Sequence, residues 1–271
     1  MHLVDRESVK DLMAAAFIEP SKDKGQNFLV DVEKCKNIVK LLKNNANSQV
    51  LEIGPGLGSL TYHLQEVCKN LTLIDVDPHI IYYLQCEVDE HVNVIEGDAL
   101  KYDVKDYEFI ISNIPYNITS DLMEHILLSG ENVKQFVLMI QKENFAHFYM
   151  TNGSEYGPLS VLVHLLGDIK KAFDVGAASF VPKPKCTSTV FTIEINSNYD
   201  RNKAIETYNL AKKLFLNRRK TILNNLGVVI GKDKANELLN QLNISLLKRP
   251  EELSPETFYK INNLINENNN K

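Results

Sequence analysis

The sequence lacks the features that would place the protein in a membrane or direct it out of the cell. No apolar run approaches the roughly 18 residues that cross a bilayer as a helix. The N-terminus carries Asp5, Glu7 and Asp11, and acidic residues there suit neither a secretory signal nor a transit peptide. We therefore expect a cytoplasmic protein with no membrane partner.

Cysteine is scarce, and its spacing indicates no special chemistry. No two of the four cysteines form a Cys-x-x-Cys pair, and none has a histidine at a spacing typical of zinc sites. We expect reduced thiols in or near the core, and no metal site. The four residues are Cys35, Cys68, Cys86 and Cys186.

Positive charge is not in excess either, because the formal net charge is -5 at pH 7. A polyanionic partner would therefore have to meet a local basic face. Residues 212–220 provide a candidate, with five positive charges and no acidic residue. Such a run is also typical of a solvated helix face, and the sequence leaves both interpretations open. The candidate RNA contacts in this segment are Lys212, Lys213, Arg218, Arg219 and Lys220.

Short apolar runs alternate with amphipathic segments up to residue 197. This alternation predicts an α/β fold with a parallel, doubly wound sheet and helices on both faces. Residues 5–17 have helical spacing, and Asp31 is the expected N-cap of a second helix over 31–43. The expected strands are 49–53, 71–74, 92–95, 109–112, 135–140 and 190–195. The expected helices between them include 59–67, 78–87, 119–128 and 143–150.

Only helical patterns follow residue 197. They cover residues 201–216, 218–226, 232–241 and 255–266. The polar segment 196–198 is a natural joint between the two regions. We expect a Rossmann-like domain over 1–197 and a small all-helical domain over 198–271.

The strongest local signal is the segment 50–61, which reads VLEIGPGLGSLT. It combines a buried strand, an acidic residue, the glycines Gly54, Gly56 and Gly58, and the start of a helix. Glycines let the backbone turn sharply and approach a ligand closely. This pattern occurs in dinucleotide and S-adenosylmethionine sites. Pro55 and the short glycine spacing favour S-adenosyl-L-methionine as the cofactor.

Two aspartates follow the next two expected strands. Asp75 lies 19 residues after Gly56, where a carboxylate can accept hydrogen bonds from both ribose hydroxyls. Asp98 could accept a hydrogen bond from the adenine amine of the cofactor, or it could simply be a turn residue. Asp77 precedes Pro78 and is typical of a helix cap. Ligands of open α/β sheets bind at the carboxyl ends of strands, where these positions meet.

The segment Asn113, Ile114, Pro115 and Tyr116 follows the fourth expected strand, and its composition suits methylation of a base amine. Adenine's exocyclic amine is a poor nucleophile because its lone pair is delocalised into the ring. The side-chain oxygen of Asn113 and the carbonyl oxygen of Ile114 could accept the two N–H groups, since Pro115 holds Ile114 extended. Tyr116 could stack on the base. The alternative is a turn in which Asn caps and Pro-Tyr packs.

A base can reach such a site only after leaving its helix or loop. Phe180, in the segment 179–185, is a candidate to cover the second face of the base. Lys183 and Lys185 in the same segment could contact phosphates.

These motifs together resemble the KsgA family, the adenine dimethyltransferases of small-subunit ribosomal RNA. The resemblance covers nearly the whole chain and includes GQNFL at 25–29, GD at 97–98, the segments 113–120 and 141–143, and the loop 180–188. It implies two methyl transfers to each of two adjacent adenosines near the 3′ end of that RNA, in a precursor particle. It also implies cofactor roles for Asn27 and Leu29, and a protein that is monomeric off the ribosome.

The macrolide-resistance dimethyltransferases of large-subunit RNA share the first two-thirds of this pattern. Residues 218–226 and 250–253 instead resemble the KsgA branch. The chain departs from the family after Glu143, where an arginine is usual, and at Cys186-Thr187, where an apolar-acidic pair is usual. A third alternative is a ribosome-assembly or transcription factor that has kept the fold without the activity, although the intact 113–116 segment argues against it.

Overall fold

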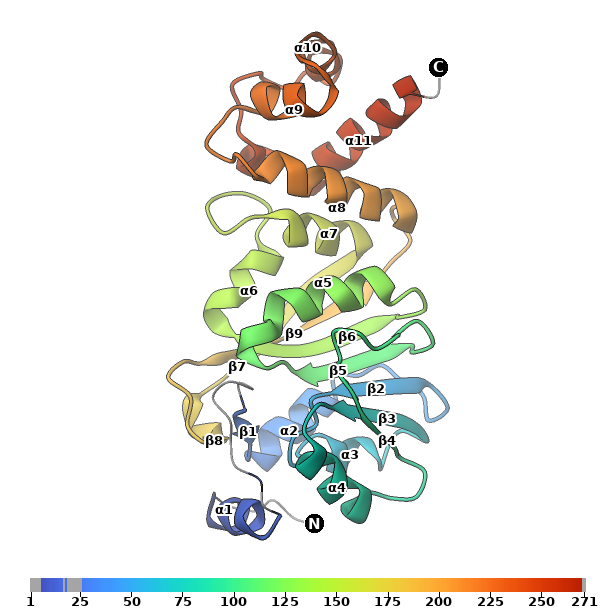
Figure 1. The fold of residues 1–271 in the computed structure, drawn as a ribbon, viewed down its shortest axis with the longest axis vertical. Helices are drawn as coiled ribbons and strands as arrows, with labels where there is room; N and C mark the ends of the chain where they lie inside the picture. Colours follow the sequence, from blue (N-terminus) through green and yellow to red (C-terminus); the bar gives the residue numbers. More distant parts are fainter. Residues whose placement is uncertain (1–5, 17, 19–25, 270–271) are drawn as a thin grey trace. The chain divides into compact units, whose positions relative to one another are not determined.

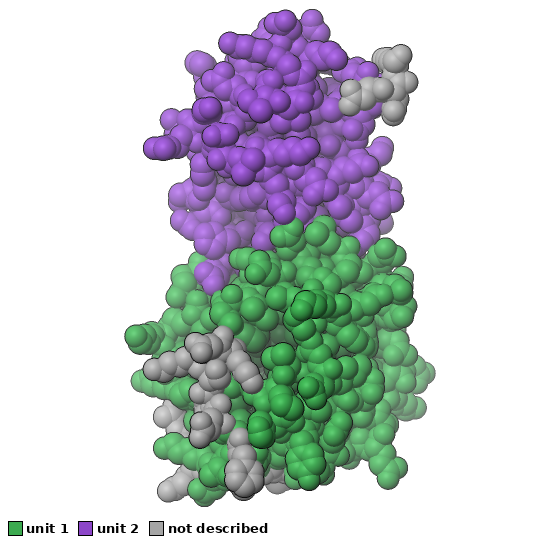
Figure 2. All heavy atoms as spheres, in the orientation of Figure 1, with its two compact units in different colours: residues 1–143, 170–194 green, residues 144–169, 195–271 purple. Residues whose placement is uncertain are grey.

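The computed structural model of the protein describes residues 6–16, 18 and 26–269 (Figure 1). Two compact units divide the chain. Unit 1 contains residues 1–143 and 170–194, and unit 2 contains residues 144–169 and 195–271 (Figure 2). Unit 2 thus includes a segment that the sequence assigned to the first domain, and a boundary between two domains at residue 197 stays a prediction. Gly25 of the expected N-terminal motif lies outside the described residues.

Unit 1 is built on a seven-stranded sheet with the order β4-β3-β2-β5-β6-β9-β7. The first five strands in this order are parallel, and β9 pairs antiparallel with β6. The strands are β2 Gln49–Ile53, β3 Asn70–Asp75, β4 Asn93–Glu96, β5 Phe109–Asn113, β6 Gln135–Gln141, β7 Gly167–Val175 and β9 Ser188–Ile195.

The expectation of a wholly parallel sheet is therefore wrong at β9. A parallel neighbour requires a crossover, usually a helix, whereas a strand that returns without one runs antiparallel. No α-helix lies between β7 and β9, which are joined by the short 3-10 helix η2 Ala177–Ser179 and the two-residue β8. The strand β7 itself was missed by the sequence pattern, because the exposed Lys170 and Lys171 interrupt its alternation.

Helices cover both faces of the sheet, as predicted (Figure 1). On one face lie α2 Val32–Val39, α3 Thr61–Leu64 and α4 Pro78–Glu87, and on the other lies α5 Thr119–Ser129. Asp31 caps α2 as expected, because its carboxylate accepts a hydrogen bond from the Lys34 amide at 3.1 Å. The helix α3 is shorter than the 59–67 that the sequence predicted.

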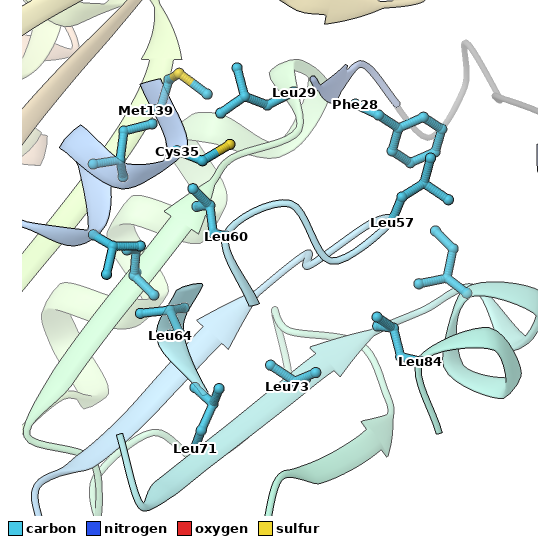
Figure 3. Packing of buried hydrophobic residues seen from close by; sticks show 14 of the residues in the cluster. Phe28, Leu29, Cys35, Leu57, Leu60, Leu64, Leu71, Leu73, Leu84 and Met139 are labelled. Atoms are coloured by element: carbon cyan, nitrogen blue, oxygen red, sulfur yellow. The ribbon is translucent and has the colours of Figure 1, made fainter. Parts of the chain in front are cut away.

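An apolar cluster fills the space between the first of these faces and its helices. Figure 3 shows side chains of α2, α3 and α4 meeting those of the strands, including Cys35, Leu64, Leu73, Leu84 and Met139. Burial raises the pKa of Cys35 to about 12 and that of Cys68 to about 11, so both thiols are poor nucleophiles at neutral pH. Cys86 is exposed and Cys186 half-buried, so the expectation of buried thiols holds for two of the four.

A second, two-stranded sheet joins distant parts of the chain. β1 Phe28–Leu29 pairs antiparallel with β8 Phe180–Val181, and Leu29 lies opposite Phe180. The amide of Val30 also donates to the carbonyl of Ser179 at 2.8 Å. This pairing fixes the segment that carries Asn27 and Leu29, and two residues are too few for a sequence pattern to predict.

Unit 2 is helical around α8, which α7 and α11 contact. Thr221 caps α9 through its side chain, so residues 216–221 form a turn, and the helix expected over 218–226 begins later. No helix within the described ranges is long and apolar enough to cross a membrane. The remaining helices are α1 Arg6–Ala15, α6 Lys142–Tyr149, α7 Pro158–Leu166, α8 Arg201–Phe215, α9 Ile222–Ile230, α10 Lys232–Gln241 and α11 Pro255–Asn269, with 3-10 helices η1 Tyr116–Ile118 and η3 Pro250–Glu252.

Candidate active site

A cavity of about 310 Å³ lies in unit 1 at the carboxyl ends of the parallel strands. It brings together most of the cofactor residues predicted from the sequence, although these are distributed over almost ninety positions of the chain. The predicted residues that line it are Asn27, Leu29, Gly54, Gly56, Asp75, Asp98 and Asn113, together with Ile114, Pro115 and Tyr116. Gly58 instead lines a smaller neighbouring cavity.

The glycine loop has the backbone conformation that its composition predicts. Gly54, Gly56 and Gly58 have φ values of +66°, +54° and +80°, a region that side chains other than glycine rarely adopt. A Cβ on Gly56 would also lie only 2.9 Å from the Phe28 ring. The loop at Gly56 therefore packs against Phe28 with no room for a side chain, and the backbone at Gly54 and Gly56 lines the cavity directly.

Asp75 lies at the end of β3, half-buried in the cavity wall. Its Oδ1 accepts a hydrogen bond from the amide of Asp77 at 2.9 Å. Burial raises the pKa of Asp75 above its usual range, and the charge of Asp77 adds to this. Asp77 is the N-cap of α4, as predicted, since its carboxylate accepts from the amide of His79 at 3.1 Å.

Asp98 is a turn residue that also lines the cavity, and its bond to the cofactor's adenine amine stays a prediction. Its Oδ1 accepts a hydrogen bond from the Leu100 amide at 3.0 Å, as in a turn, while the residue also lines the cavity. The bond from Leu100 holds the pKa of Asp98 below its ordinary value, and the ion pair with Lys101 at 3.3 Å contributes. An ionised carboxylate is therefore available at this wall.

The segment 113–116 lies at the same cavity as the glycine loop. Asn113 donates through Nδ2 to the carbonyl of Asn27 at 3.4 Å, so its amide oxygen is the atom suited to accept from a ligand. Ile114 is buried and donates its amide to the carbonyl of Met139 at 3.0 Å. A Cβ added on Gly54 would come within 3.9 Å of Cδ of Pro115. The two segments are therefore close neighbours on the cavity wall.

Phe180 lies elsewhere than the sequence interpretation placed it. Its ring is fully buried in the apolar cluster and does not line the cavity. Phe28, on the paired strand, is the aromatic residue whose ring faces the glycine loop and the cavity. Stacking of Phe180 on a target base stays a prediction that requires its side chain to move. Lys183 and Lys185 are exposed nearby in sequence.

Comparisons with known proteins point to one family. The model of the ribosomal RNA adenine dimethylase family matches residues 20–267. The ribosomal RNA small subunit methyltransferase A of Malacoplasma penetrans is 36% identical, covering 89% of this chain and 90% of the relative. The protein of that name from Nostoc sp. is 33% identical, covering 92% and 98%. The chain belongs to the ribosomal RNA adenine dimethylase family.

Solved structures show the same fold. A dimethyladenosine transferase from Plasmodium falciparum superposes with a TM-score of 0.76 and 26% identity, covering 89% of this chain and 98% of that one. The 23S rRNA methyltransferase ErmE has a TM-score of 0.69 and 20% identity, and this likeness concerns the fold alone. The resemblance inferred from the motifs is confirmed, and membership of the dimethylase family implies S-adenosylmethionine as methyl donor.

Sequence reasoning missed one group in the cavity of this dimethylase. Glu52 is the penultimate residue of β2 and lies on the cavity wall. It is 1% exposed and accepts a hydrogen bond from Oγ1 of Thr61 at 2.7 Å. Burial raises the pKa of Glu52 to about 8, the bond from Thr61 opposes this, and the charge of Asp75 adds to it. The signal was present, because an acidic residue stands among the apolar residues of the strand two positions before the first glycine.

The positively charged residues of the segment 212–220 differ in their exposure to solvent. Lys212, Lys213, Arg219 and Lys220 are exposed, on α8 and in the turn after it. Arg218 is half-buried, and its guanidinium donates to the carbonyls of Gly153 at 3.1 Å and Tyr156 at 3.4 Å. Arg218 therefore holds a loop of unit 2, and a contact with RNA stays a prediction. The described part of the chain holds no cluster of potential metal ligands.

Proposed function

We propose that the cavity binds S-adenosylmethionine and that Asn113 to Tyr116 present the exocyclic amine of an adenine to it. The observation that carries this proposal is that the glycine loop and residues 113–116 line one cavity. A donor held by the loop and an acceptor held by Asn113 would then be neighbours, as an in-line transfer requires. Catalysis would then come mostly from orientation of the two reactants.

The residues on the cavity wall fit the parts of this cofactor. Gly54 and Gly56 line the cavity without side chains, so the backbone can approach a ligand closely. We assign Asp75 to the ribose hydroxyls and Asp98 to the adenine amine, with Asn27 and Leu29 completing the wall. We assign Glu52, which is buried on the cavity wall, to the ammonium group in the methionine part of the cofactor. When bound, the cofactor supplies an electrophilic methyl group on a sulfonium.

The target amine is activated by two acceptors. We assign these to the amide oxygen of Asn113 and the carbonyl oxygen of Ile114, which draw the lone pair out of conjugation. Tyr116 stacks on the base. The pKa of Tyr116 is raised, mainly by burial, so its hydroxyl stays protonated and is no general base. None is needed at the outset, because the amine becomes acidic only after the methyl group has moved.

The substrate we propose is small-subunit ribosomal RNA in a precursor particle, with two methyl groups added to each of two adjacent adenosines near its 3′ end. Relatives that this chain matches over nearly their whole length carry the name ribosomal RNA small subunit methyltransferase A, which supports this choice. The exposed Lys212, Lys213, Arg219 and Lys220 provide a basic surface for phosphates. The protein would act as a monomer.

The test is methylation of purified ribosomal subunits that lack the modification. We expect transfer to the small subunit, with mass spectrometry locating N6-dimethyladenosine at two neighbouring positions. Transfer only to the large subunit would instead support the macrolide-resistance type. An Asn113→Ala variant should lose about 10²- to 10³-fold in kcat and retain its fold. Methylation by this variant at the parent rate would contradict the mechanism.

A further inference from the structure

We propose that Ser188 is a positioning residue for Tyr116, whose ring it holds in the orientation that stacks on the target adenine. The two hydroxyl oxygens lie 3.0 Å apart. Ser188 is completely buried, whereas Tyr116 is half-buried and lines the cavity. The inference rests on the proposed function of the 113–116 segment and adds a residue that does not itself touch the base.

The sheet topology explains how two residues so distant in sequence meet. Tyr116 follows β5, and Ser188 is the first residue of β9, two strands away in the sheet. Because β9 runs antiparallel to β6, its first residue lies opposite Gln141 at the carboxyl end of β6. Ser188 is therefore at the edge of the sheet where the cavity opens. Ser188 thus belongs to the sheet, whereas the ring of Tyr116 belongs to the segment that follows β5.

The backbone around Tyr116 does not by itself determine where the ring points. Tyr116 begins the 3-10 helix η1 of three residues, and in the described structure no side chain caps its start. A tyrosine ring can rotate about two side-chain bonds. A hydrogen bond to the hydroxyl, at the far end of the ring, restricts rotation about the Cα–Cβ bond and so fixes where the ring lies. It leaves the ring faces free to meet a base. Residues of a binding site need such support to keep a productive geometry.

Two other side chains influence the same hydroxyl. Burial is the largest influence on the pKa of Tyr116, the bond to Ser188 opposes it, and Cys186 and Glu143 raise the pKa further. A thiol is a weak donor and a weak acceptor, so Cys186 is the poorer anchor. The distance and the burial of Ser188 make its hydroxyl the group that fixes the ring.

A double-mutant cycle on methyl transfer to small subunits tests this role. Ser188→Ala and Tyr116→Phe delete the same hydrogen bond from its two ends. Each should lower kcat about two- to tenfold, the range expected for one neutral hydrogen bond, with cofactor affinity unchanged. The double variant should be no worse than either single variant. Thr192→Val, on the same face of β9, is the matched control and should keep the parent kcat.

Several results would overturn the proposal. Losses that multiply in the double variant would show that the two hydroxyls act independently, and a Ser188→Ala protein with the parent kcat would show that no anchor is needed. If Ser188→Ala does not fold, Tyr116→Phe still removes the bond from the cavity side, and an unchanged kcat there refutes the role. Failure of the parent protein to methylate small subunits would instead reject the proposed function itself.

Discussion

Replacement of Glu52 by glutamine should change how the stability of the protein depends on pH. Glu52 is 1% exposed, and burial raises its pKa from the ordinary 4.5 to about 8. Between these two values the folded protein binds a proton that the unfolded chain has released. The free energy of unfolding therefore falls as the pH rises through this window. Glutamine cannot ionise, so this part of the decline should vanish in Glu52→Gln.

The magnitude follows from the two pKa values. Between pH 5.5 and pH 7.5, the linkage amounts to about 2.5 kcal/mol for a group that titrates at 4.5 when unfolded and at about 8 when folded. The free energy of unfolding of the parent should thus fall by about 2.5 kcal/mol more than that of Glu52→Gln over this interval. The glutamine side chain keeps an acceptor for the hydroxyl of Thr61, so packing should change little.

The assay is urea unfolding of the ligand-free protein at the two pH values, analysed by linear extrapolation. Glu108→Gln is the control, because the bond from Lys134 lowers the pKa of Glu108 and places its titration below this window. Its unfolding free energy should shift equally at both pH values. Parallel curves for the parent and Glu52→Gln would refute the reasoning, since they would mean that Glu52 is already ionised in the folded protein at pH 5.5.

Three other predictions concern ligands. Gly56→Ala should weaken cofactor binding at least tenfold in calorimetry, because the φ of +54° at Gly56 and the ring of Phe28 exclude a Cβ. Unchanged affinity would show that the conformation of the glycine loop does not matter for the cofactor. Asp75→Asn should weaken the cofactor similarly but leave 2′,3′-dideoxyribose analogues unaffected. The double variant Arg219→Glu/Lys220→Glu should weaken RNA binding. A plot of the logarithm of the binding constant against the logarithm of the salt concentration should become shallower by about 0.7 to 0.9 per lost phosphate contact. An unchanged slope would show that these two side chains do not contact phosphates.

Arg218 is omitted from the charge reversal for a structural reason. Its guanidinium holds the carbonyls of Gly153 and Tyr156, so its reversal would disturb unit 2 as well as any contact with RNA.

Several local features were predictable because neighbouring residues encode them. The conformation of the glycine loop follows from the need for positive φ at alternate positions. The helix caps Asp31, Asp77 and Thr221 show the same principle. Thr221 was not recognised as a cap, so the helix after it was predicted to begin at residue 218 and not at Ile222. Strand direction at β9 could not be predicted in this way, since it depends on how the chain crosses the sheet.

The chemistry of the candidate site could be predicted from local patterns: a glycine loop, two carboxylates at the ends of successive strands, and the Asn113 to Tyr116 segment, in an order that brings them to one edge of the sheet. Which side chains reach that edge depends on the fold. Phe180 is buried, Arg218 donates to backbone carbonyls, Glu52 accepts from Thr61 on the cavity wall, and Tyr116 meets Ser188 across 72 positions of the chain. Burial and hydrogen bonding arise from contacts between distant segments, and local spacing does not record these contacts.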